Sequence, residues 1–97
     1  MAVTRAVGRR LGDVGGSIRR WRIMQSLKAA ELAQRAGISR TTLQKIERGD
    51  PGVSIGAVMS VMQALGQLDH VAESFDPLST DVGRLRSTES LPERVRR

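Results

Sequence analysis

Five polar side chains recur along one short stretch in a pattern that suits recognition of nucleic-acid base edges. None of the five is acidic, and they are Arg40, Thr41, Gln44, Lys45 and Arg48. Arginine and lysine hydrogen-bond to guanine O6 and N7, glutamine pairs with adenine, and a threonine methyl can contact a thymine methyl. Because an α-helix fits the major groove of DNA, one helix face bearing these side chains predicts base or groove contacts.

Three side chains in and beside this set are better suited to phosphates, where they would position the protein without reading sequence. They are Ser39, Thr42 and Arg48. Two alternatives stay open: an ordinary polar helix face of a protein-binding domain, and, for Thr42, an inert surface residue. The predicted DNA-binding set is therefore Ser39, Arg40, Thr41, Thr42, Gln44, Lys45 and Arg48.

Two short helices around a sharp turn must hold these side chains. Gly37 separates them, and glycine permits a left-handed backbone at little cost. Ser39 is a favourable N-cap for the second helix, in which Leu43 and Ile46 are spaced i, i+3 to form a buried side. The pattern predicts helices over residues 29–36 and 40–48.

Three further helices follow from apolar spacing and end signals. The first covers residues 17–26, and the fourth begins after the N-cap Ser54 and ends at Gly66. A fifth covers residues 68–75 and stops before Pro77. The fourth helix carries apolar residues at helical spacing: Ile55, Val58, Met59, Met62 and Leu65. The predicted class is all-α, with five helices.

Residues 14–71 resemble the Xre-type helix-turn-helix family of phage and bacterial repressors. The matching positions are Glu31-Leu32-Ala33, Ala36-Gly37, Ile38-Ser39, Leu43, Ile46-Glu47 and Gly49. The resemblance implies a five-helix repressor-type DNA-binding domain that grips a palindromic double-stranded operator as a homodimer. It also implies a structural ion pair between Arg22 and Glu47. Ala29 departs from the family, which often has a glutamine there that contacts the DNA backbone.

Charge is unevenly distributed within the net balance of +6. Residues 1–48 hold 11 Lys and Arg against 3 Asp and Glu, a balance of +8, whereas residues 49–83 hold 5 acids and no Lys or Arg. Clustered cations favour phosphate binding through counterion release, so the DNA-facing side is expected in the first half. The acidic middle is expected to face away from DNA or toward another protein.

The chain is predicted to have three parts: a flexible basic arm over residues 1–13, the helix-turn-helix domain over 14–75, and a polar, partly disordered tail over 76–97. The arm carries Arg5, Arg9 and Arg10, which either follow DNA phosphates or only keep the chain soluble. Leu68, Val71 and Phe75 exceed what a small core needs, so the fifth helix, with nearby tail residues, is the predicted dimer face.

The ending over residues 91–97, LPERVRR, resembles the tails of HipB-like antitoxins, which are Xre-type repressors that bind a HipA-like kinase toxin. That resemblance implies an autoregulating antitoxin with a kinase toxin as partner. The alternatives are a stand-alone transcriptional regulator with a basic extension, and a protein-interaction module that keeps the fold without binding DNA.

The sequence argues against several other classes. It has no cysteine, and His70 is its one histidine, so no zinc site is expected. No paired carboxylates, nucleophile set or phosphate-cradling glycine loop is visible, so we expect neither an enzyme nor a cofactor. No segment is long and apolar enough to cross a bilayer, and no secretory signal is visible. The expectation is a cytoplasmic bacterial protein, associated with the nucleoid when bound to DNA.

Overall fold

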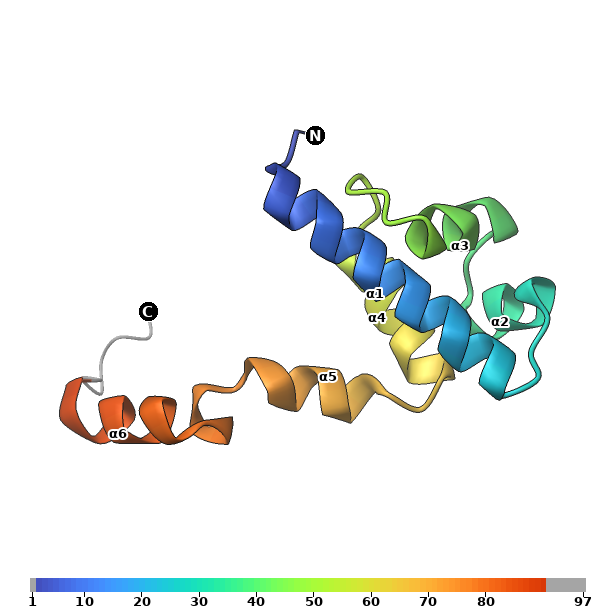
Figure 1. Ribbon diagram of the computed structural model, residues 1–97. Helices are drawn as coiled ribbons and strands as arrows, with labels where there is room; N and C mark the ends of the chain where they lie inside the picture. The colour runs from blue at the N-terminus through green and yellow to red at the C-terminus, as the bar shows by residue number, and fades with distance from the viewer. Residues whose placement is uncertain (1, 91–97) are drawn as a thin grey trace.

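The computed structural model describes residues 2–90, with side chains through residue 88. This part of the chain is all-helical, as the sequence predicted (Figure 1). Six α-helices and one short 3₁₀ helix follow one another: α1 (Arg5–Met24), α2 (Ala29–Ala36), α3 (Arg40–Glu47), α4 (Ile55–Ala64), α5 (Leu68–Phe75), η1 (Pro77–Ser79) and α6 (Asp81–Ser90). The expected helices over 29–36 and 68–75 have the bounds of α2 and α5, and α3 ends one residue earlier than expected.

The first helix departs most from expectation, because α1 begins at Arg5 where a flexible basic arm was predicted. The hydroxyl of Thr4 caps it by accepting a hydrogen bond from the backbone N–H of Val7 at 3.1 Å. Gly15 lies buried within α1, and the α3–α4 loop packs against the same helix around Gly12. The glycines that suggested a flexible segment are thus part of a continuous helix. The prediction of a flexible basic arm is therefore corrected: from Arg5 onward the arm is helical. The division of the chain into arm, domain and tail stays a prediction.

The α2–turn–α3 unit forms as its end signals predicted. Gly37 adopts a positive φ of 71°, and Ser39 accepts a hydrogen bond from the backbone N–H of Thr42 at 3.0 Å. At the start of α2, the carboxylate of Glu31 accepts from the backbone N–H of Lys28 at 2.8 Å. Local capping therefore sets where both helices begin.

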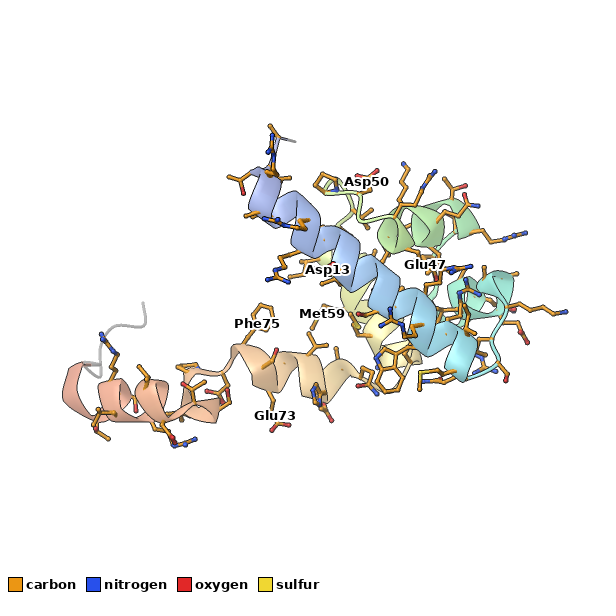
Figure 2. The ribbon with its side chains drawn as sticks, in the orientation of Figure 1. Asp13, Glu47, Asp50, Met59, Glu73 and Phe75 are labelled. Carbon is orange, nitrogen blue, oxygen red and sulfur yellow. The ribbon has the colours of Figure 1, made fainter. Side chains whose placement is uncertain are left out.

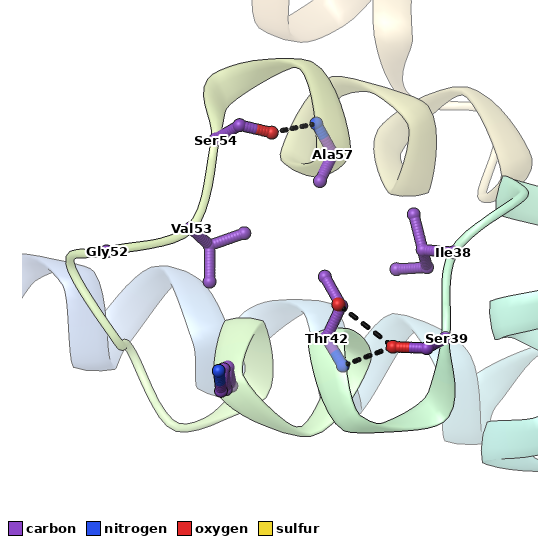
Figure 3. A pocket seen from close by; sticks show the side chains of 8 residues that line it. Ile38, Ser39, Thr42, Gly52, Val53, Ser54 and Ala57 are labelled. Carbon is purple, nitrogen blue, oxygen red and sulfur yellow. Dashed lines mark hydrogen bonds between the residues drawn. The ribbon is translucent and has the colours of Figure 1, made fainter.

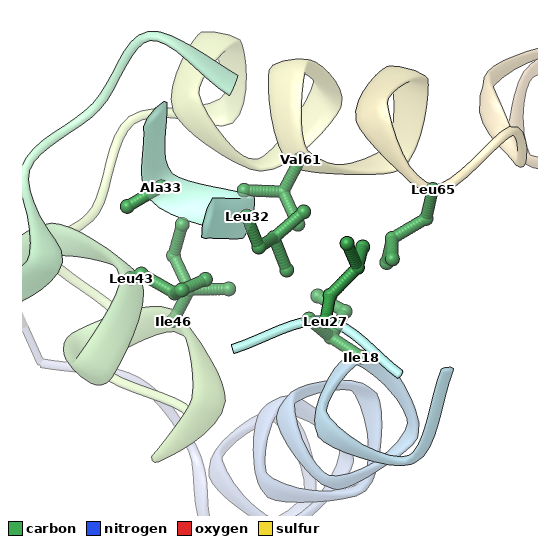
Figure 4. Packing of buried hydrophobic residues seen from close by; sticks show 8 residues of the cluster. All are labelled: Ile18, Leu27, Leu32, Ala33, Leu43, Ile46, Val61 and Leu65. Atoms are coloured by element: carbon green, nitrogen blue, oxygen red, sulfur yellow. The ribbon is translucent and has the colours of Figure 1, made fainter. Parts of the chain in front are cut away.

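Four helices enclose the core, and Figure 4 shows their apolar side chains converging. Ile18 from α1, Leu32 from α2, Leu43 from α3 and Val61 from α4 are almost fully buried. The complete buried set is Ile18, Leu27, Leu32, Ala33, Leu43, Ile46, Val61 and Leu65. Ile55, one of the five apolar residues at helical spacing on α4, stands at the first turn and is 76% exposed. We call α1 to α4 the four-helix body.

The α5–α6 segment, residues 68–90, extends away from the four-helix body (Figure 1). It contains a sixth helix, α6, in a region predicted to be partly disordered, so the count of five helices is corrected. The short helix η1 begins at Pro77. The side chain of Asp76 caps it by accepting a hydrogen bond from the backbone N–H of Leu78 at 2.8 Å. The radius of gyration is 16.1 Å, against about 13 Å for a compact chain of similar length.

Two further expectations concern residues 91–97 and membrane-spanning helices. Residues 91–97, which carry the resemblance to HipB-like tails, lie outside the described residues. Among the helices that are described, none combines the length and the hydropathy that a membrane crossing requires.

Candidate DNA-binding surface

The outward side of α3 carries most of the predicted DNA-binding residues. At about 100° per residue, Thr41, Gln44 and Lys45 share a face opposite the buried Leu43 and Ile46. All three are exposed, as are Arg40 at the first turn and Arg48 at the end of the helix. These exposed side chains can meet an external partner along the length of the helix.

A second group of predicted residues lines a hollow of about 350 Å³ between α3 and the start of α4 (Figure 3). Ser39, Thr42 and Lys45 form the α3 side of this hollow, and Gly52 and Ser54 form part of the other. The Ser39 hydroxyl donates to the Thr42 hydroxyl at 3.0 Å and accepts from the Thr42 backbone N–H at the same distance. The structure thus brings three of the seven predicted residues together beside α4.

The loop between α3 and α4 belongs to this surface, and the sequence prediction did not include it. Ser54 caps α4 by accepting from the backbone N–H of Ala57 at 3.1 Å, and Asp50 accepts from the backbone N–H of Gly52 at 2.7 Å. The signal was present in the sequence as an N-cap serine after a Pro-Gly turn. The pattern did not show that this turn lies across one hollow from Thr42 and Lys45 in the folded chain.

One acidic residue of α3 is turned away from this surface. Glu47 accepts two hydrogen bonds from Arg22 of α1, from Nε at 2.8 Å and from Nη2 at 3.1 Å. The side chains of Arg22 and Glu47 are only 13% and 11% exposed. Hydrogen bonding to Glu47, reinforced by its charge, raises the pKa of the Arg22 guanidinium against the effect of burial. The pair predicted by resemblance is therefore present, and it neutralises the carboxylate that would otherwise repel phosphate.

Backbone contact between α1 and the end of α3 fixes the direction of α3 further. A Cβ atom built on Gly15 would lie 2.5 Å from the carbonyl oxygen of Ile46, and one on Gly49 would lie 2.7 Å from the backbone nitrogen of Gly12. Gly49 also has a positive φ of 79°. Glycine at positions 15 and 49 lets the two backbones touch. In Figure 2, Glu47 lies at the same junction of α1 and α3.

The basic residues of the expected arm stand on the N-terminal half of α1. Arg5, Arg9 and Arg10 are exposed there, and Arg10 pairs with Asp13 at 3.1 Å on the helix surface. Because these arginines stand on a helix, they cannot wrap around a partner as a flexible arm would. The structure gives them no contact with the residues of α3.

Comparison with known proteins gives one family match and one relative. Residues 18–70 match the model of a family described as helix-turn-helix. A relative from Sinorhizobium fredii (strain NBRC 101917 / NGR234) is named "Uncharacterized HTH-type transcriptional regulator y4mF". It is 39% identical to this chain over 54 residues, which make up 56% of this chain and 71% of the relative. No solved structure matches the chain.

Proposed function

This chain belongs to the helix-turn-helix family, and from that premise we propose that it is a sequence-specific DNA-binding transcriptional repressor. The observation that carries the proposal is the outward face of α3, on which Thr41, Gln44 and Lys45 are exposed while Glu47 is turned inward to Arg22. A short helix with basic and amide side chains and no outward carboxylate suits the major groove. The relative's name, which describes a transcriptional regulator, supports the same function.

Within that surface we assign two kinds of contact. Arg40, Thr41 and Gln44 are the residues for base edges, since they stand on α3 away from the α4 side. Ser39, Thr42 and Lys45 face the hollow beside α4, where a backbone phosphate would meet an ammonium group and the hydroxyls of Ser39 and Thr42. Arg48, exposed where α3 ends, serves phosphate as well. Lys45 therefore moves from the base-reading role that its residue type predicted to a positioning role.

The operator is expected to be palindromic and the bound species a homodimer. Two copies of α3 related by a two-fold axis enter successive major grooves roughly 34 Å apart. The fifth helix supports this assembly, because α5 has no buried residue in the single chain. Phe75, near its end, is 79% exposed and open to a partner.

The decisive experiment is a fluorescence-anisotropy titration of the full chain on its own upstream DNA and on random DNA, at several salt concentrations. We expect selective binding whose affinity falls steeply with salt. Gln44→Ala should weaken operator binding by about 1–3 kcal/mol and reduce selectivity, whereas Lys45→Ala should weaken both DNAs alike and lower the salt slope by about 1. If neither DNA is retained at low salt, the chain is a protein-interaction module instead.

A matched control separates a local contact from a general loss of positive charge. Arg20 is exposed on α1, two residues before Arg22. It is not part of α3, and it does not line the hollow beside α4. Arg20→Ala removes the same charge as Arg40→Ala. Only Arg40→Ala should change which base is preferred, and equal losses in both variants would contradict the assignment of Arg40 to base contacts.

A finer proposal is that the chain is the autoregulating antitoxin of a HipA-like kinase toxin. It is supported by the resemblance of residues 91–97 to HipB-like tails. Co-expression with a kinase-like protein encoded beside this gene tests it: the full chain should restore growth, and a chain ending at residue 90 should bind the operator without doing so. Equal protection by both chains, or the absence of any toxic neighbour, would leave a stand-alone regulator.

A further inference from the structure

An apolar trough runs along one side of α1 and ends against α5. Its N-terminal part is a hollow lined by Ala6, Val7, Leu11 and Val14, with Arg10 at the edge. The rest is a hollow of about 520 Å³ whose apolar walls are Val14, Ile18, Trp21, Met62 and Val71. The two hollows share Val14, so together they form one continuous surface from residue 6 to residue 21.

The trough is open in the single chain. Val7, Val14 and Trp21 are all more than a third exposed. Contiguous exposed apolar surface of this kind marks an interaction site in a small protein. None of the exposed large apolar side chains of α5 or α6 lines either hollow, so within residues 2–88 the N-terminal hollow is lined by α1 alone.

The α5–α6 segment has the complementary property. Phe75, Leu78, Val82 and Leu85 are 51–79% exposed along it. In Figure 2, Phe75 projects into the space beside α5, on the side opposite Glu73. On α5, Leu68 and Val71 are partly buried and Val71 already lines the trough of its own chain, so Ala72 and Phe75 are the exposed apolar residues of this helix that a groove in another molecule could receive.

Charge favours the pairing of the trough with such a helix. The N-terminal half of α1 carries Arg5, Arg9 and Arg10 against Asp13 alone. The region of α5 carries Asp69, Glu73 and Asp76 and no Lys or Arg. Opposite charge beside matched apolar surfaces favours encounter and sets the register of the contact.

The occupant must come from another molecule. Gln67, His70 and Val71, at the start of α5, already form one wall of the larger hollow. The same α5 cannot be both that wall and the helix lying in the trough. A second copy of this chain presents the required acidic, apolar helix, and a two-fold axis buries both troughs and both segments at once.

We propose that the trough along α1 is the seat for the α5–α6 segment of a second copy, so that the homodimer is joined by reciprocal exchange of these segments. This inference rests on the proposed function for its need of two copies, and it deepens that function by assigning α1 to the dimer interface. The N-terminal half of α1 must then be helical, because a flexible arm would not line up its apolar residues along one side. Its apolar residues hold the partner.

Sedimentation velocity of the full chain tests the trough with a matched pair of variants. Val7 is 47% exposed inside the trough, and Ile23 is 53% exposed on the same helix outside it. Val7→Glu should raise the dimer dissociation constant at least tenfold, whereas Ile23→Glu should leave it within about twofold. A dimer that tolerates Val7→Glu as well as Ile23→Glu, or a wild-type chain that stays monomeric, would overturn the proposal. Equal thermal midpoints in dilute solution, where both variants are monomeric, exclude misfolding as the cause.

Cross-linking identifies the contact itself, because the natural chain contains no cysteine. Variants Val7→Cys and Phe75→Cys are mixed and treated with a short bis-maleimide linker, with Ile23→Cys plus Phe75→Cys as control. We expect a mixed covalent dimer in the first mixture well above the control. Equal yields in both mixtures would contradict exchange between copies. So would an internal cross-link within one chain when Val7→Cys and Phe75→Cys are combined in the same chain.

Failure of this inference and failure of the proposed function give different results. Dimers that depend on Val7 but bind no DNA would refute the repressor and leave the interface standing. Selective operator binding by dimers that ignore Val7 would refute the interface alone.

Discussion

The four-helix body and the α5–α6 segment are both helical but differ in how much of their apolar surface they bury. All eight buried apolar side chains among the described residues lie between Ile18 and Leu65, within the body. Neither α5 nor η1 has a buried residue, and four large apolar side chains of the segment stay open to solvent: Phe75, Leu78, Val82 and Leu85. Helical structure alone therefore does not distinguish the regions, whereas burial does.

This difference indicates what each region does. The body orients α3 through its own core, its ion pair and its backbone contacts, so one chain by itself holds the candidate surface in place. The segment presents apolar residues that lower the free energy only when something covers them. Substitutions in the body should therefore change the stability of the monomer, and substitutions in the segment should change assembly.

The largest effect is expected at the centre of the body. Leu32 is completely buried, so Leu32→Ala should lower the free energy of unfolding by roughly 4 kcal/mol through lost burial and the cavity it leaves. Urea unfolding followed by circular dichroism measures this loss. A change smaller than about 1 kcal/mol would mean that the body has no tightly packed core.

The ion pair of the body should matter more than that of the segment. Glu47→Ala strands the nearly buried Arg22 guanidinium and should cost about 3 kcal/mol of unfolding free energy. Asp81 pairs with Arg84 on α6, where both side chains are more than half exposed. Asp81→Ala should change the unfolding free energy by less than about 0.5 kcal/mol, as solvent screens the pair. Similar losses in both variants would remove the contrast between the two regions.

Two adjacent glycines of α1 allow a finer test of the body. Gly15→Ala places a methyl group 2.5 Å from the carbonyl oxygen of Ile46, and should destabilise the chain by about 1–3 kcal/mol. A Cβ atom on Gly16 meets nothing within 4 Å. Gly16→Ala should therefore stabilise the chain by about 0.5–1 kcal/mol, because alanine favours the helix. Thermal midpoints that shift in the same direction would show that α1 and α3 are not in close contact.

These glycines also explain where prediction from sequence stopped. The all-α class, the turn at Gly37 and the caps at Ser39 and Ser54 depend on neighbouring residues, and all were predicted. The glycine-rich beginning looked flexible because local propensity disfavours a helix there. Gly15 instead allows contact with Ile46, which is 31 residues away and has no signature near Gly15. Tertiary packing outweighed propensity.

The candidate surface shows the same division. Helical spacing predicted that Thr41, Gln44 and Lys45 share an exposed face. Spacing could not predict that the loop before α4 returns to Thr42 and Lys45, because the path of a loop depends on how α3 and α4 pack. The pairing of Arg22 with Glu47 came from family resemblance, and residue spacing alone did not contain it.

The smallest stability effect is expected in the segment, and it is the sharpest test of the comparison. Leu85 is 61% exposed, so Leu85→Ala in dilute solution should change the unfolding free energy by less than about 0.5 kcal/mol. The same substitution in the body, Leu32→Ala, serves as its control. Raising the protein concentration above the dimer dissociation constant should make Leu85→Ala destabilising, since association stabilises the folded chain by mass action. A large loss in dilute solution would show instead that α6 packs on its own body, and the two regions would then form one core.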